Sequence, residues 1–192
     1  MWILIAGLVL FLGAHSVRIV AEGWRIRTIA RWGEGPWKAT YSLISALGFV
    51  LIIWGFSLAR MAPMQLWGPP PGMRHLAWLL TLVAFVLLVA AYVPGNHFKA
   101  RLHHPMVLSV KVWALAHLLV NGNLAHVVLF GSFLVWAVAD FAAARRRDRS
   151  GKVVYAPGRW GPTVVTLVVG GLAWAAFALW LHGLLMGIRV MG

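Results

Sequence analysis

The segment that decides the fold runs from His103 to His126 and reads HHPMVLSVKVWALAHLLVNGNLAH. It holds two apolar runs of the kind that lie in lipid, and it places among them four of the chain's eight histidines, one lysine and an Asn-Gly-Asn turn at 121–123. Polar groups are costly at membrane depth, so these side chains need partners within the protein. The segment therefore predicts two membrane helices joined by a polar turn.

The composition of the whole chain agrees with a membrane protein. Of its 192 residues 61% are hydrophobic and 11% charged, and the mean hydropathy is +0.83. Such a chain has too little polar surface for a soluble domain of this size. Several apolar runs approach the roughly 20 residues that a helix needs to cross about 30 Å of hydrocarbon, whereas the short alternating segments of a β-barrel are absent. We expect an all-α, polytopic transmembrane helix bundle.

The absence of some residue types restricts the chemistry. The chain has no cysteine, which excludes disulfides, thiolate ligands and covalent c-type haem attachment. No acidic residue lies within an apolar run, Asp140 being near the end of one, so carboxylate-rich sites for calcium, magnesium or two irons are not expected. Any metal or haem would have to be held by histidine.

Six apolar segments form a single domain without internal repeats. The first has no basic residue before Arg18, so we expect a retained span rather than a signal peptide. The expected spans are Trp2–Val20, Trp37–Ala59, His75–Val93, Pro105–Val120, Leu124–Ala143 and Pro162–Ile188.

The net charge of +13 is interpreted as a topology signal, and no nucleic-acid partner is expected. Fourteen lysines and arginines fall in the connections on one side of the six spans, and only Arg60, Arg74 and Arg189 fall on the other. Because basic residues collect on the cytoplasmic side, both termini are predicted to lie outside the cytoplasm.

The fourth and fifth spans allow two arrangements. Lys111 and Asp140 both favour the cytoplasmic surface, and the apolar stretch between them is short for two crossings. Either Lys111 reaches the surface from one turn inside the bilayer, which we prefer, or the pair is a shallow hairpin whose turn is shielded by protein.

Two histidines lie inside spans with no acidic partner at their depth. His15 stands one turn before Arg18, and His117 stands one turn after Ala114, a small residue that leaves room for a flat macrocycle. Each is either hydrogen-bonded within the bundle or an axial ligand of haem. In the six-span arrangement the two differ in depth by about 10 Å, so helix tilt or a shallow hairpin is needed to bring them together.

The remaining histidines offer weaker candidates. His104 precedes the helix start at Pro105, where it could contact a haem propionate or a lipid head group, and His126 is a candidate for core hydrogen bonding or secondary ligation. Zinc would need three or four convergent ligands, for which the candidates are His15, His103, His104 and His117. His75, His97 and His182 are expected near interfaces or loops without a functional role. The expected propionate partners are Arg18, Arg101 and Lys111.

Four motifs together resemble the NnrU family of bacterial membrane proteins, which is similar to the plastid 15-cis-zeta-carotene isomerase. They are Gly13–Arg18 (GAHSVR), Pro94–Lys99 (PGNHFK), His103–Met106 (HHPM) and Lys111–Gly122 (KVWALAHLLVNG). The resemblance covers essentially the whole chain. It implies an inner-membrane protein that binds non-covalent haem b.

The resemblance also implies roles for single residues. His15 and His117 match the histidines implicated as haem ligands in the isomerase, and His104-Pro105 matches its His-Pro helix start. The isomerase's proposed alternate cysteine ligand is replaced here by Ala114, which leaves bis-histidine or single-histidine ligation.

Three functions remain open from the sequence. The first is a haem b protein whose iron serves electron transfer, binds nitric oxide in denitrification-linked chemistry, or isomerises a polyene. The second is a membrane methyltransferase similar to the isoprenylcysteine carboxyl methyltransferases, which share a basic-His-Pro motif. The third is a cofactor-free assembly factor or transporter component.

Overall fold

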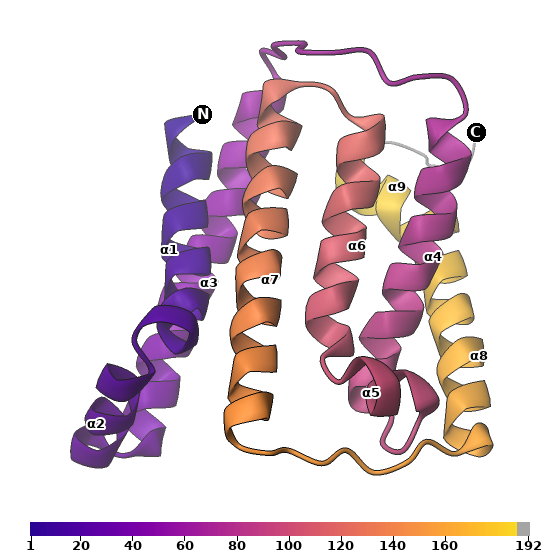
Figure 1. The fold of residues 1–192 in the computed structure, drawn as a ribbon. Coiled ribbons are helices and arrows are strands. Elements are labelled where there is room, and N and C mark those ends of the chain that lie inside the picture. Colours follow the sequence, from indigo (N-terminus) through magenta and orange to yellow (C-terminus); the bar gives the residue numbers. More distant parts are fainter. Residues whose placement is uncertain (188–192) are drawn as a thin grey trace.

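The computed structural model describes residues 1–187, and these fold into helices without a β-strand (Figure 1). The all-α, polytopic bundle is therefore confirmed. Five helical stretches are long and apolar enough to cross a membrane, and Pro105–Val120 is a shorter apolar helix. The end of the last expected span, Ile188, lies outside the described residues. The elements are α1 (Trp2–Val20), α2 (Glu22–Trp32), α3 (Glu34–Arg60), α4 (Met73–Tyr92), α5 (His97–Leu102), α6 (Pro105–Val120), α7 (Leu124–Ser150), α8 (Trp160–Ala176), the π-helical turn η1 (Phe177–Leu181) and α9 (His182–Met186).

Helix α7 joins two groups of helices. On one side α1 packs against α3, and on the other α6 packs against α4, which in turn packs against α8 (Figure 1). The central apolar cluster draws on four of these helices. It consists of Leu4, Leu8, Ile52, Ala114, Leu129 and Phe130. Large apolar side chains also cover the outside of the bundle, among them Leu43, Leu79 and Leu172, which is the surface expected of a protein surrounded by lipid.

Helices α1 and α3 approach each other closely because glycines face the contact. A Cβ atom on Gly7 would lie 2.6 Å from the backbone nitrogen of Ile52. The absence of side chains at such positions lets helix backbones pack directly, as is common between membrane helices.

The polar turn at 121–123 is covered by the segment that joins α3 to α4. The backbone N–H of Leu66 donates to the carbonyl of Gly122 at 2.8 Å, and the N–H of Leu124 donates to the carbonyl of Met64 at 2.9 Å. The turn thus reaches the same end of the bundle as the N-terminus (Figure 1). Protein thus shields the turn, as a shallow hairpin would require, and α6 with its 16 residues is shorter than the five stretches that can cross a membrane. Lys111 lies within α6 with its ammonium 4.6 Å from the ring centre of Phe141.

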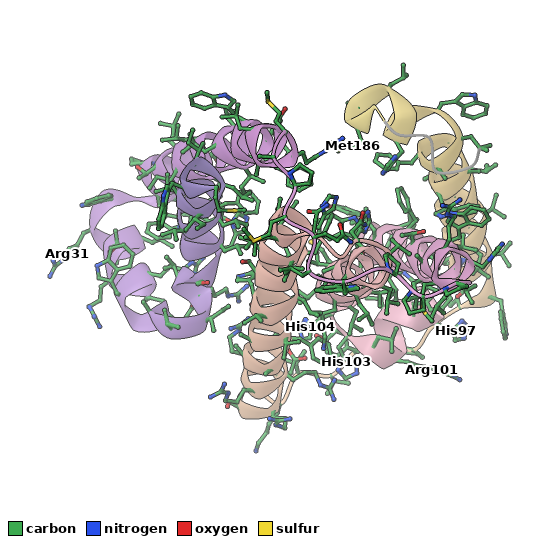
Figure 2. All side chains as sticks on the ribbon, turned by 90° about the horizontal axis from the view of Figure 1, so that it is seen from above. Arg31, His97, Arg101, His103, His104 and Met186 are labelled. Atoms are coloured by element: carbon green, nitrogen blue, oxygen red, sulfur yellow. The ribbon has the colours of Figure 1, made fainter. Side chains whose placement is uncertain are left out.

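The opposite end of the bundle carries most of the basic residues, and we call it the basic end. It contains α2, α5 and the 151–159 connection (Figure 1). Neither α2 nor α5 was expected as a helix. Helix α2 is amphipathic, with Trp24 and Trp32 exposed beside its arginines. Seen along the bundle, Arg31 and Arg101 point away from it (Figure 2).

The Pro94–Lys99 motif has a structural role in this fold. Asn96 is fully buried and caps α5 by accepting a hydrogen bond from the N–H of Lys99. The backbone N–H of His97 donates to the Thr163 hydroxyl at 3.0 Å, and its ring Nδ1 lies 2.8 Å from the same oxygen. The motif therefore fastens the end of α4 to the start of α8.

Candidate functional site

Both predicted axial ligands are held in the same way by their own helices. Nδ1 of His15 lies 2.7 Å from the carbonyl oxygen of Phe11, and Nδ1 of His117 lies 2.8 Å from that of Trp113. A carbonyl can only accept, so Nδ1 carries the proton in each ring and Nε2 keeps its lone pair. This is the tautomer and the type of hydrogen bond that orient a histidine toward a metal.

The structure does not bring these two imidazoles together. His15 contacts Trp136 and His117 contacts Phe130, which are six residues apart on α7 and so differ in depth by about 9 Å. Within the described residues α1 and α6 make no backbone contact. Three aromatic rings form a row of successive contacts in space from His15 to His117. They belong to Phe11, Phe133 and Trp113. A single haem shared by His15 and His117 is not supported by this arrangement.

Aromatic rings surround His15. Phe11 stacks on it at 4.3 Å, Tyr41 lies at 5.2 Å, and Trp136 meets it edge-on at 6.0 Å, all measured between ring centres. The bond to the Phe11 carbonyl matches the bond that His117 makes to Trp113, so this bond alone does not distinguish a metal ligand from a histidine bonded within the bundle.

His117 belongs to a second group of side chains, near the end of the bundle opposite the basic end. Its ring stacks on Phe130 at 4.4 Å, and the ring of His126 lies 5.9 Å from the same phenyl group. His182 begins α9, the helix whose Met186 carbonyl accepts hydrogen bonds from Arg60 of α3. We call this group, with Arg60, the outer histidine site. It collects residues from α3, α6, α7 and α9.

The cation of the outer histidine site is one that the sequence did not single out. Arg60 lies 5.8 Å from the ring centre of Phe56, and that ring meets the ring of His126 edge-on at 5.0 Å. Both of its terminal nitrogens donate to the carbonyl oxygen of Met186, at 3.3 Å each. His182 was likewise expected to have no role. The signal that could have identified Arg60 was its position as one of only three basic residues on that side.

The cations predicted to hold propionates lie elsewhere. Arg18 pairs with Glu22 at 3.8 Å, next to α2. Lys111 lies six residues before His117, about 9 Å nearer the basic end. Arg101 lies in α5 at the basic end, where its side chain points outward (Figure 2). The structure therefore gathers none of the three around His117.

His104 takes part in a separate cluster at the basic end. Its Nε2 lies 2.8 Å from a carboxylate oxygen of Asp148, and the Tyr155 hydroxyl donates to that oxygen at 3.1 Å. His103 stacks on Tyr155 with ring centres 4.0 Å apart and accepts from Arg145. Burial and the adjacent Asp148 carboxylate raise the pKa of Tyr155. The cluster joins the start of α6, the end of α7 and the 151–159 connection.

The four histidines considered as zinc ligands do not come together in the structure. His103 and His104 lie at the basic end, and His15 and His117 are separated as described above. Across residues 1–187, no group of three or more histidine, aspartate or glutamate side chains is arranged to hold a metal ion.

Comparison with known proteins gives one match. No curated protein and no solved structure matches the chain. The family model described as NnrU protein matches residues 3–190, nearly the full length. The chain is therefore a member of the NnrU family of membrane proteins.

Proposed function

We propose that this NnrU protein binds haem b within its membrane bundle, with Nε2 of His117 as an axial ligand. The observation that supports the proposal is the hydrogen bond from Nδ1 of His117 to the Trp113 carbonyl, which leaves Nε2 available and fixes the ring. When bound, the haem would supply an iron centre for electron transfer or for binding a small molecule such as nitric oxide.

The residues around His117 fit such a group. The rings of Trp113 and Phe130 offer apolar contact on its own helix and on α7. Arg60 is the nearby cation that could pair with a propionate. Ala114 is fully buried in the central cluster and has no donor atom, so its position offers no alternate ligand. Ligation therefore depends on histidine.

The proposal includes an orientation in the bacterial inner membrane. By the positive-inside rule the basic end faces the cytoplasm and the N-terminus faces the periplasm. The outer histidine site then lies in the periplasmic half of the bilayer. Nitric oxide and polyenes are apolar and dissolve in lipid, so either could approach the site from within the membrane.

An optical spectrum of the protein purified in detergent tests the proposal. We expect a Soret band in the wild-type protein and loss of bound haem in His117→Ala. His75→Ala is the control histidine variant, because the ring of His75 packs on Trp78 of its own helix α4. A wild-type protein that takes up no haem, or a His117→Ala protein with an unchanged spectrum, would refute the assignment.

Two further additions separate the rival functions. Nitric oxide added to the reduced protein should shift the Soret band if one axial position can be vacated. Binding of S-adenosylmethionine by a haem-free protein would instead favour the methyltransferase. A protein that binds neither haem nor S-adenosylmethionine would favour the cofactor-free assembly factor.

A further inference from the structure

An apolar groove runs between α1 and α7, and we call it the α1–α7 groove. It has a volume of about 800 Å³, and exposed residues such as Val9 and Val135 line it, so it opens to the outside of the bundle. Apart from Ser16, Ser132 and Trp136, its lining consists of aliphatic residues and glycines. The Ser16 hydroxyl already donates to a carbonyl of its own helix, at 2.6 Å. The groove therefore offers mainly apolar contact.

The groove is long and hollow. A Cβ atom added to Gly13 on α1 or to Gly131 on α7 would lie in open space, with nothing within 4 Å. On α1 the groove extends from Ile5 to Val20, which is about 22 Å at the helical rise of about 1.5 Å per residue. Half of a hydrocarbon core of about 30 Å is about 15 Å. The groove is thus long enough to take an extended acyl chain of one membrane leaflet.

Arginines lie where the groove reaches the basic end. Ala139 is the last residue of α7 in the groove, and Arg146 lies about two turns further along the same face of that helix, with an exposed side chain. Arg147 reaches across to α1, where it donates to the Arg18 carbonyl at 3.2 Å. The side chain of Arg18 is itself 60% exposed. The basic end therefore places guanidinium groups from both helices beside the mouth of the groove.

Carboxylates neutralise only part of this charge. Glu22 lies 3.8 Å from Arg18, and Asp140 lies 3.8 Å from Arg147. None of the ion pairs within residues 1–187 involves Arg146. The mouth of the groove thus keeps a net positive charge, next to an apolar channel that lies along the membrane helices.

We propose that the α1–α7 groove binds an anionic phospholipid, with one acyl chain along the groove and the phosphate at Arg146 and Arg18. Guanidinium groups pair strongly with phosphate oxygens, and basic residues beside membrane helices attract anionic head groups. The inference does not depend on haem, because α1 and α7 alone form the groove. A second copy of the chain is a less suitable occupant, since a symmetric dimer would bring two basic ends together and their like charges would repel.

Native mass spectrometry of the full chain in detergent tests the head group. Phosphatidylglycerol and phosphatidylcholine with the same palmitoyl and oleoyl chains are titrated separately, and we expect the wild type to bind phosphatidylglycerol more tightly. Arg146→Gln should weaken phosphatidylglycerol binding by about fivefold, the effect of one basic residue at an anionic membrane surface, and leave phosphatidylcholine binding unchanged. Arg31→Gln is the matched control, because it removes the same charge from α2, where the side chain points away from the bundle (Figure 2).

A second pair of variants tests the acyl chain. Gly131→Leu fills the groove and should weaken the binding of both lipids. Gly171→Leu is its matched control, because it places the same side chain in open space on α8, outside the groove. Should Gly131→Leu not fold, Gly13→Leu fills the groove from the α1 side and gives the same comparison.

Several results would overturn the inference. Equal affinity of the wild type for the two lipids would remove the head-group contact, and equal lipid binding by Gly131→Leu and Gly171→Leu would remove the groove. Competition by glycerol phosphate, which has no acyl chain, would show a site for free phosphate instead of a lipid. A wild-type dimer that Gly131→Leu dissociates would assign the groove to a second copy of the chain.

Discussion

The contact between α1 and α3 offers a quantitative test of the fold. In Gly7→Ala the new Cβ atom would lie 2.6 Å from the nitrogen of Ile52 and 2.9 Å from the carbonyl oxygen of Gly48. Ordinary van der Waals contacts of a Cβ atom lie at 3.4–4 Å, so the closest approach is about 0.8 Å too short. The atoms in the way belong to the α3 backbone and cannot rotate aside. The two helices must therefore separate.

The expected cost can be isolated with a second substitution on the same helix. Gly13→Ala places a Cβ atom where nothing lies within 4 Å, and it brings the same gain in helix propensity. The difference between the two variants therefore measures the overpacking, which we expect to destabilise Gly7→Ala by about 1–3 kcal/mol relative to Gly13→Ala. Titration of detergent-solubilised protein with sodium dodecyl sulfate, followed by circular dichroism, gives both free energies of unfolding. Equal stability of the two variants would refute the close contact.

Three further predictions concern the two ends of the bundle. Gly122→Ala should displace the 61–72 segment and raise protease cleavage there, whereas Gly68→Ala, which has open space around it, should not; equal cleavage would contradict the described contact. The raised pKa of Tyr155 means that its neutral phenol is stabilised in the folded protein, so this contribution is complete below pH 10 and is lost as the pH rises through the folded pKa. Tyr155→Phe should therefore unfold with less dependence on alkaline pH than the wild type, and an identical pH profile would argue against the bond to Asp148. Reporter fusions at Ser150 should be active in the cytoplasm and at Gly68 in the periplasm, and the reverse pattern would overturn the proposed orientation.

Much of the fold could be predicted from the sequence, because hydropathy and charge act locally. The apolar runs mark the spans within a few residues, and α1 and α6 begin and end where expected. The separation of basic residues between the two ends follows from the same local preference. The sequence does not predict helix α2, because its arginines fit a polar connection equally well, although an amphipathic segment with tryptophans and arginines is typical of an interfacial helix.

The identity of the partners in each site depended on tertiary structure. The sequence shows that His15 and His117 lie within apolar segments, but a histidine's depth and neighbours depend on how helices pair and rotate. The order in which the helices pack separates His15 from His117, and the π-helical turn at Phe177–Leu181 has no evident sequence signal. Composition determined that only histidine could hold a metal or haem in this membrane protein. Packing decided which histidines can face one another, because side chains far apart in the chain meet only where their helices are neighbours.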